Sequence, residues 1–522
     1  MVMRAQKLLV VSLAQVSLCA TLQGATSAPG EQSQPSDSGP QAGKAVYLQH
    51  CVACHGVNGN GTGPASVWLF PRPRNFSAGL FKIKSTPGMA LPTDADLFNS
   101  VTRGMPGSSM PSFTYLTDQE RHDAVQYIKY LTAFTDAAGK RVNRFEEARK
   151  SNQLAEPIQV PPEPPVTVQS LAEGARLFSK LNCVLCHGET GAGDGPNAST
   201  LKDTQGLYLP PRDFNTGAFR GGHTGRDLFT RISIGLAGTP MVAFDNKIMT
   251  DQERWSLVHF IQSLRRKDVE INDLLAPTDG LVRALRLRGK LPVDPGDPAW
   301  EAMDPTRITL NPLWPEKDAI YAVAVRAVHD SKRLAILCTW KDPVPDGAPV
   351  RVQDFQDAIA LQFSMNGNTP FLGMGDANNP VNIWQWKAGW QQEADGHRQD
   401  MPDQYASMHV DTYFATSYRT AADAGNAVSV PHRSPVEDAN AHGFVTLKSQ
   451  PPAGQNVSGK GIWRDGSWSV LFVRDLKSRE SDDVKFAVGT PTPVAFAVWD
   501  GQNRDRNGRK VVSNWHKLIL EP

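Results

Sequence analysis

Hydrophobic residues follow different periods in the two halves of the chain. Up to about residue 267 they recur three or four positions apart, as in Val125, Ile128 and Leu131, and this spacing places them on one helix face. Beyond that point, short segments with a period of two replace the helical pattern, which is typical of β-strands. The chain therefore divides into a helical first half and a β-rich second half.

The β-rich half combines short strands with turns. Turn-forming pieces such as 345–347 and 465–466 separate the predicted strands, and ten of the 12 tryptophans lie here, which suits wide, half-buried sheet faces. This pattern predicts an antiparallel β-sandwich across residues 300–522. The predicted strands cover residues 319–325, 333–340, 358–363, 467–473 and 493–499.

The helical half is an internal duplication. The sequence Cys-Val-Ala-Cys-His-Gly of residues 51–56 recurs as Cys-Val-Leu-Cys-His-Gly at 183–188. Two homologous helical domains are expected, at residues 41–135 and 171–267. The other matching segments are a helical lead-in (43–47 and 174–178), a Gly-rich loop (59–64 and 191–196), a Pro-Arg-x-Phe segment (73–76 and 211–214), an Asp-Leu-Phe segment (96–98 and 227–229) and a closing capping box (117–120 and 250–253).

The segment between the two repeats and the N-terminal segment differ in composition from the helical domains. Residues 136–170 contain the proline-rich run 160–165, which cannot be helical and predicts an extended linker that separates the two domains or sets them against each other. Residues 1–28 combine a positively charged start, a short apolar run and small residues, and this pattern predicts a signal peptide and an exported, periplasmic protein. Cys19 raises the alternative of a lipoprotein, although Leu18 before it fits lipid-site processing poorly.

Charge and composition limit the kinds of partner. The 522 residues carry 54 Lys and Arg against 53 Asp and Glu, a net charge of +1, so nucleic acid is not expected as a partner. No segment after the signal peptide is long and apolar enough to span a bilayer. The six cysteines are too few for a disulfide scaffold of this length.

Each repeat carries Cys-x-x-Cys-His, the attachment signature of c-type haem. The two thiols bond to the vinyl groups of the macrocycle, and the adjacent histidine reaches the iron from the same turn. A redox dithiol would not require this histidine in both copies, and a zinc site would need a second ligand pair nearby. The motifs predict two covalent haem c groups, attached at Cys51, Cys54, Cys183 and Cys186 and ligated by His55 and His187.

The repeat also selects a sixth ligand for each iron. The loops before the two closing helices align so that Met110 pairs with Met241, whereas Met105 faces a leucine. Core packing is the alternative role of either methionine, and His122 and His259 are rival ligands at non-equivalent positions. A methionine ligand raises the potential and fills the site that oxygen or peroxide chemistry needs. The two haems are therefore expected to be electron carriers.

In these features, residues of about 41–135 and 171–267 resemble class I cytochrome c domains, which have a methionine on the loop before the last helix. The resemblance covers a little under half of the chain and implies that both domains are all-α. Cys338 is the one cysteine that remains once Cys19 is removed with the signal peptide and the four haem cysteines are used, and it is expected to be a buried thiol.

The β-rich half resembles a second family. Its segments 370–376, 381–387, 466–470 and 499–510, taken in this order, resemble the haem-binding domain of the ethylbenzene dehydrogenase type. That domain is the small β-sandwich subunit that accompanies molybdenum enzymes of the dimethyl sulfoxide reductase family. This chain differs because the domain is fused behind two c-type domains, which puts docking to a molybdenum partner in doubt.

The second resemblance implies one non-covalent haem b held between a methionine and a lysine. Met374, in Gly-Met-Gly-Asp, and Lys510 match these ligands. Their alternative roles are a core methionine and a surface lysine, and Met365 and Lys387 are the nearest substitutes. A lysine ligand must be neutral, so its site is expected to be dry enough to lower the pKa.

The fold class predicted from these features is a multidomain protein, with two all-α cytochrome c domains followed by an antiparallel β-sandwich. The predicted function is periplasmic electron transfer, without catalysis, to or from a redox enzyme such as a molybdenum oxidoreductase or a terminal reductase. One alternative is a dihaem enzyme such as a peroxidase. Another keeps two c haems and makes the β-domain a haem-free docking module.

Overall fold

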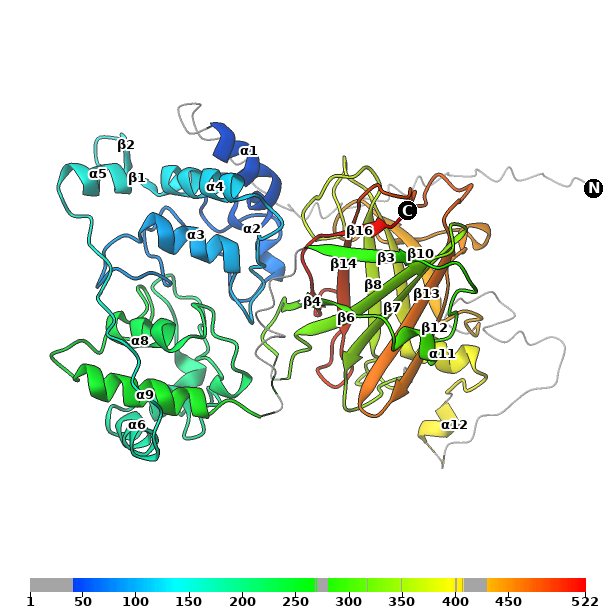
Figure 1. Cartoon of the computed structure of the whole chain (residues 1–522). Coiled ribbons are helices and arrows are strands. Elements are labelled where there is room, and N and C mark those ends of the chain that lie inside the picture. The colour runs from blue at the N-terminus through cyan, green and yellow to red at the C-terminus, as the bar shows by residue number, and fades with distance from the viewer. Residues whose placement is uncertain are drawn as a thin grey trace, which may run out of the picture.

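The computed structural model describes residues 41–522 except 268, 270–279, 317, 349, 400, 406 and 408–429. Two small helical units lie one beside the other, and both face a large β-sheet unit (Figure 1). The predicted signal peptide, residues 1–28, and Cys19 lie outside the described residues.

The two helical units repeat one arrangement of four helices. The first contains α1 (Gln41–His50), α2 (Val52–His55), α3 (Asp94–Arg103) and α4 (Asp118–Leu131), and then β1 (Ala133–Thr135), β2 (Arg141–Asn143) and α5 (Arg144–Lys150). The second contains α6 (Val168–Lys180), α7 (Val184–His187), α8 (Gly225–Ile234) and α9 (Asp251–Ser263). Short 3-10 helices lie between them at Ser66–Trp68, Ala198–Thr200 and Phe214–Thr216.

The first and last long helices of each unit pack very closely. A Cβ atom on Gly43 of α1 would lie 2.1 Å from the Asp123 carbonyl oxygen of α4, and one on Gly174 of α6 would lie 2.1 Å from the Ser256 carbonyl oxygen of α9. Only glycine fits at these equivalent positions, because any side chain would collide with the backbone of the facing helix. The two closing helices begin with the predicted capping boxes, which both form.

The linker sets the helical units against each other. The residues predicted as linker, 136–170, contain the turn 136–140, β2, α5 and the start of α6, and the long stretch between α5 and α6 has no regular element. Lys82 of the first unit pairs with Asp203 of the second (3.4 Å), and Arg231 donates to the Lys84 carbonyl. The two units are therefore in direct contact.

The β-rich unit is built on one sheet of fourteen strands. The helices α11 (Ala388–Ala394) and α12 (Met401–Gln404) accompany it. The strands are β3 (Leu281–Arg286), β4 (Thr306–Thr309), β5 (Asn311–Pro312), β6 (Ala322–His329), β7 (Arg333–Lys341), β8 (Ala358–Ser364), β9 (Val381–Lys387), β10 (Val436–Ala441), β11 (Lys448–Ser449), β12 (Ser458–Arg464), β13 (Ser467–Asp475), β14 (Thr492–Trp499), β15 (Val511–Val512) and β16 (His516–Leu520).

The sheet is mixed, which corrects the prediction that it is antiparallel. Its main path runs β11-β10-β9-β8-β14-β16-β3-β6-β7-β13-β12. The strand β3 pairs in parallel with both β16 and β6, because the chain enters the unit through β3 and inserts it between two later strands. The strands are joined in one continuous sheet, so the two separate sheets expected of a sandwich are not confirmed.

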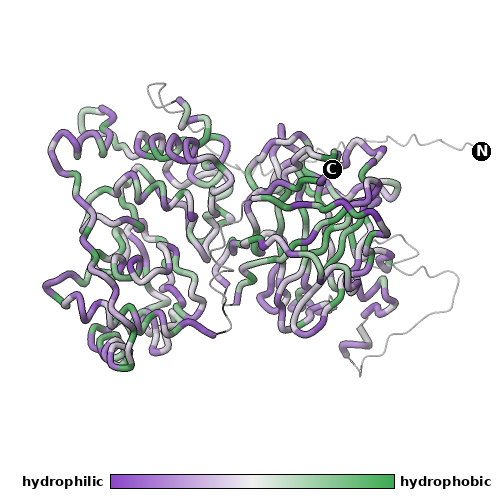
Figure 2. The backbone as a smooth tube through the Cα atoms, viewed as in Figure 1, coloured by the Kyte–Doolittle hydropathy of each residue, from purple (hydrophilic) through white to green (hydrophobic). Residues whose placement is uncertain are grey.

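The sheet curves so that its ends meet. A Cβ atom on Gly461 of β12 would lie 2.2 Å from the Trp386 ring of β9, and one on Gly459 would lie 2.4 Å from Val436 of β10. The concave face encloses the main hydrophobic core, which contains the predicted lone thiol, Cys338, as a buried free cysteine. Hydrophobic segments are concentrated in these strands (Figure 2). The convex face of β8 and β14 remains available to face the helical units.

Candidate haem sites around one shared cavity

One cavity of about 1520 Å³ lies where the three units meet, and all three line it. Sites for a single small ligand measure roughly 300–1,000 Å³, so this cavity has room for more than one such ligand. All of the side chains predicted to attach a haem or to ligate its iron line this cavity. These are Cys51, Cys54, His55, Met110, Cys183, Cys186, His187, Met241, Met374 and Lys510.

Each Cys-x-x-Cys-His motif forms a single tight turn at the cavity wall. The motif residues form α2 and α7, and the Gly-rich loop that follows bonds back to each turn. Gly61 and Gly63 donate their N–H groups to the His55 and Cys54 carbonyls (2.9 and 3.1 Å). A Cβ atom on Gly63 would lie 2.3 Å from the Ala53 carbonyl oxygen. The glycines are therefore needed for the loop to lie directly on the haem-attachment turn.

The repeated Pro-Arg-x-Phe segment fixes both histidine rings. The Arg74 carbonyl lies 3.0 Å from Nδ1 of His55, and the Arg212 carbonyl lies 3.3 Å from Nδ1 of His187. Because a carbonyl can only accept, each Nδ1 carries the proton, and each Nε2 keeps the lone pair that a metal needs. Phe76 stacks on the His55 ring with centroids 4.5 Å apart. The second repeat has the equivalent Phe stack at 4.4 Å.

Burial keeps the first histidine neutral. It lowers the pKa of His55 to about 4, and burial also lowers the pKa of His187. A neutral imidazole is the form that binds iron. Both rings are therefore in the protonation state that an axial ligand requires.

The loops that carry Met110 and Met241 have the same hydrogen bonds. In the first loop the Met110 carbonyl accepts from the Met105 N–H (2.9 Å), and the Ser108 hydroxyl donates to the Met105 carbonyl (2.7 Å). In the second loop Met241 and Thr239 make the equivalent bonds at 3.0 and 2.8 Å. The two methionines therefore occupy structurally equivalent positions, in agreement with the alignment of the two repeats.

The rival ligands differ in their positions. Met105 also lines the cavity. By contrast, neither His122 nor His259 lines it. His122 stacks on Phe98 at 4.1 Å, and buried His259 lies 3.0 Å from the Ser170 hydroxyl. The two histidines have packing roles away from the cavity.

Positive side chains gather on the cavity wall between the helical units. The Nε atoms of Arg212 and Arg220 are buried, and neither has a hydrogen-bond partner among the described residues. Burial and the nearby Arg212 charge lower the pKa of Arg220 to about 9. Buried guanidinium groups need anionic partners, and haem propionates would supply carboxylates. The set that lines the cavity is Arg74, Lys82, Arg212, Arg220 and Arg231.

The β-unit presents a floor of small side chains to the cavity. Ala358 and Ala360 of β8 and Ala495 and Ala497 of β14 lie on one face of neighbouring strands and pack in one cluster. The residues between them point into the hydrophobic core on the other face. Alanines in this arrangement leave a flat apolar surface, on which a planar macrocycle can lie.

Met374 and Lys510 lie at this floor. Met374 packs against the alanine cluster and has a positive φ of 67°, a backbone conformation that is uncommon outside glycine. The Lys510 ammonium lies over the Trp499 ring, 4.6 Å from its centroid. Burial lowers the pKa of Lys510 to about 8, and among the described residues it has no ion-pair partner.

The two substitutes fit less well. Met365 packs against the hydrophobic core on the other face of the sheet and does not line the cavity. Lys387 lines the cavity, but its ammonium lies 4.0 Å from a Glu437 carboxylate oxygen and 3.7 Å from the Trp390 ring centroid. Burial lowers the pKa of Lys387 as well, but the Glu437 carboxylate opposes this shift because it stabilises the charged form of the lysine, which cannot bind a metal.

The role of the Pro-Arg-x-Phe segments could not be recognised from the sequence alone. Their recurrence after both haem motifs was the signal, because a residue pair retained at matching positions in two copies serves the same site. The alanine floor could not be predicted either, since alternating alanines on separate strands give no pattern that distinguishes a ligand surface from a core.

Two family models match separate parts of this chain. Residues 40–132 and 171–265 match the cytochrome c family model, and residues 297–511 match the model described as "Ethylbenzene dehydrogenase". Covalent haem c is the cofactor of cytochrome c domains. Among the described residues, no helix has the length and hydrophobicity needed to cross a membrane.

Three curated relatives are similar over part of this chain. The "Putative respiratory nitrate reductase heme subunit ORF7" of Haloferax mediterranei is 27% identical over 205 residues, which cover 39% of this chain and 58% of that protein. Chlorate reductase subunit gamma of Ideonella dechloratans is 24% identical, over 46% of this chain and 84% of its own. Dimethylsulfide dehydrogenase subunit gamma of Rhodovulum sulfidophilum is 27% identical, over 45% and 77%.

Proposed function

We propose that this chain, which joins two cytochrome c domains to a domain of the ethylbenzene dehydrogenase type, relays electrons through two c haems and one b haem. The observation that carries the proposal is the shared cavity, because the residues of all three sites line one continuous space. When bound, the haem irons would supply one-electron oxidation and reduction. The protein supplies ligands, orientation and a dry environment.

The helical units hold the two c haems. Cys51, Cys54, Cys183 and Cys186 tether the macrocycles, and the histidine of each motif, fixed by its bond to an arginine carbonyl, ligates the iron. Met110 and Met241, which line the same cavity, would supply the second protein ligand of each iron. The buried guanidinium groups of Arg212 and Arg220 pair with propionates.

The β-unit holds the b haem on its alanine floor between Met374 and Lys510. Lys510 is the better lysine of the two, because no carboxylate of a described residue pairs with it, whereas Lys387 has Glu437 nearby. Its lowered pKa makes the neutral amine accessible near pH 8. The neutral amine is the form that donates a lone pair to iron.

The partner proposed for this chain is the catalytic subunit of a molybdenum oxidoreductase, in the periplasm after export. The relatives are the haem or gamma subunits of a nitrate reductase, a chlorate reductase and a dimethylsulfide dehydrogenase, as their names state. Electron transfer without substrate chemistry agrees with a methionine ligand for each c haem, because this ligand leaves no open position on the iron for a substrate. A peroxidase would instead need an open sixth position on one of the c irons.

The haem content of the purified protein tests this proposal. A reduced pyridine haemochrome spectrum distinguishes haem b from haem c, and we expect about two c haems for each b haem. The covalent haem c remains with the polypeptide after acid-acetone extraction, whereas haem b is removed. A protein with c haem alone would leave the β-unit as a haem-free docking module, and this result would contradict the proposed relay.

A further inference from the structure

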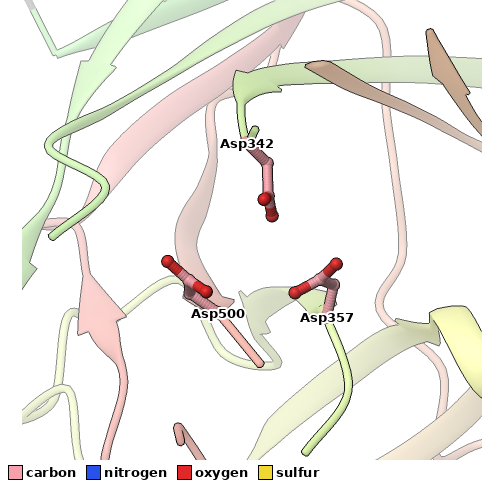
Figure 3. A group of neighbouring side chains, drawn as sticks. All are labelled: Asp342, Asp357 and Asp500. Atoms are coloured by element: carbon pink, nitrogen blue, oxygen red, sulfur yellow. The ribbon is translucent and has the colours of Figure 1, made fainter. Parts of the chain in front are cut away.

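Three aspartates of the β-unit form a buried cluster away from the haem ligands. Asp342 follows β7, Asp357 precedes β8 and Asp500 follows β14. Each offers a carboxylate oxygen, and these oxygens all lie within 4.8 Å of one another. Their carboxyl groups point toward a common centre (Figure 3). Asp357 and Asp500 flank the paired ends of β8 and β14, and the curvature of the sheet brings Asp342 at the end of β7 to them.

One of the carboxylates lacks a partner at this centre. Asp342 is 1% exposed, and its Oδ2 atom is buried without a hydrogen bond among the described residues. Its other oxygen accepts from the Val344 N–H (3.1 Å). The Trp340 indole N–H is also buried and has no hydrogen-bond partner among the described residues. A buried oxygen left unpaired is costly, so this atom indicates a missing partner in the cluster.

The other two carboxylates are firmly oriented. Asp357 accepts from the Gly501 N–H (2.9 Å), the Asp346 N–H (2.7 Å) and the Trp468 indole (2.9 Å). Asp500 accepts from the Gln502 N–H (2.8 Å). Among the described residues, no lysine or arginine forms an ion pair with any of the three aspartates. Burial, together with the neighbouring carboxyl groups, raises the pKa of Asp342 to about 7 and that of Asp357 to about 8. The cluster therefore combines fixed oxygen atoms with carboxyl groups whose charge no cation of a described residue balances.

We propose that Asp342, Asp357 and Asp500 bind a calcium ion. Ca²⁺ takes oxygen ligands at 2.3–2.6 Å, so two oxygens on one ion lie at most about 5 Å apart, which agrees with the observed cluster. Zinc favours nitrogen and sulfur ligands, and Mg²⁺ usually keeps several waters instead of entering an all-protein cage. The carboxylate of Asp346, whose Oδ2 atom is also buried without a hydrogen bond among the described residues, interacts with Asp342 and is a candidate further ligand.

The ion would stabilise one wall of the haem b site, and this consequence rests on the proposed function. Asp500 begins the segment that ends at Lys510, and Asp357 follows cavity-lining residues 354–356. The two segments are already packed closely. A Cβ atom on Gly501 would lie 2.3 Å from the Phe355 carbonyl oxygen, and the Arg506 guanidinium lies 4.9 Å from the Phe355 ring centroid. A cation shared by Asp357 and Asp500 would join these segments and position Lys510.

Equilibrium dialysis with radioactive calcium tests the site in the full-length haem protein after treatment with EGTA. We expect one ion per chain with a Kd below about 1 mM, the weak end of calcium modules. Asp500→Asn and Asp342→Asn should each weaken binding by at least about tenfold, an effect comparable to losing a supporting residue of a metal site. Asp465→Asn, on the exposed turn after β12, removes one charge and should bind calcium like the wild type.

Two results would overturn the calcium site. One is the absence of saturable calcium uptake by the wild-type protein at 1 mM, which requires no variant to fold. The other is unchanged uptake by a folded Asp500→Asn protein. The dialysis does not depend on haem b, so a protein that binds calcium but lacks haem b would count against the proposed relay alone. Calcium removal should also speed the loss of haem b to excess apomyoglobin severalfold, and an unchanged rate would contradict the positioning of Lys510.

Discussion

The Lys510→Ala protein is expected to lose its b haem and keep both c haems. Loss of a supporting residue typically weakens a metal site 10- to 100-fold, so removal of a direct ligand should weaken haem b binding by more than about 100-fold. Met374→Ala should have a similar effect, because the two side chains lie at the same apolar floor. The haemochrome spectrum and the intact mass measure the two haem types separately.

The substitutes provide matched controls for this pair. Lys387 lines the same cavity, but it lies beside Glu437, so Lys387→Ala should retain haem b. Met365 packs into the core on the other face of the sheet, so Met365→Ala should affect stability without removing haem b. Loss of haem b from Lys387→Ala with retention in Lys510→Ala would show that the lysine assignment is wrong.

Acidification should have a related effect on the same site. Burial lowers the pKa of Lys510 to about 8, so the protein without haem b contains mainly the charged lysine below this pH and mainly the neutral amine above it. Protonation competes with iron for the lone pair. Rebinding of haem b should therefore be weaker at pH 6 than at pH 9.

Replacing Met110 or Met241 by alanine is expected to lower the potential of one c haem. Axial ligands set haem potentials over a range of about 0.8 V, and loss of the thioether ligand should shift the affected haem by on the order of 0.1 V or more. Each variant should also lose about half of the weak Met-to-iron absorption band at the red end of the oxidised spectrum. Potentiometric titration monitored by absorbance gives both results.

Met105→Ala is the control for these variants, because Met105 lies in the same loop and also lines the cavity. It aligns with a leucine in the second repeat, so it should keep the potential and the absorption band. Carbon monoxide should bind to the reduced Met110→Ala protein but not to the reduced wild type. A Met105→Ala protein that loses the band, beside an unaltered Met110→Ala protein, would reverse the ligand assignment in the first domain.

The features that could be predicted from the sequence depend on neighbouring residues or on repetition. The attachment cysteines and the histidine share one turn, and the duplicated loops identify Met110 and Met241 as equivalent. The strands β7, β8 and β14 were also predicted, because their alternation reflects one face in the core. The capping boxes at Thr117 and Thr250 form as expected, since a cap is a local interaction.

The features that could not be predicted depend on how distant segments meet. The strand β3 inserts in parallel between β16 and β6, and nothing in its six residues specifies these neighbours. Asp357 and Asp500 flank the paired ends of β8 and β14, but Asp342 at the end of β7 reaches them only because the sheet curves. The shared cavity likewise requires the packing of three units. Local periodicity reports the face on which a residue lies, but it does not report which strand ends or domains come together.

Time-resolved reduction of the holoprotein tests the relay most directly. A short radiolytic pulse adds one electron to each of a small fraction of molecules, and the separate absorption bands of haem c and haem b then follow its redistribution. Because the residues of all three sites line one cavity, we predict a first-order exchange between c and b haems whose rate is independent of protein concentration. A rate that increases in proportion to protein concentration, or no exchange at all, would contradict a relay within one chain.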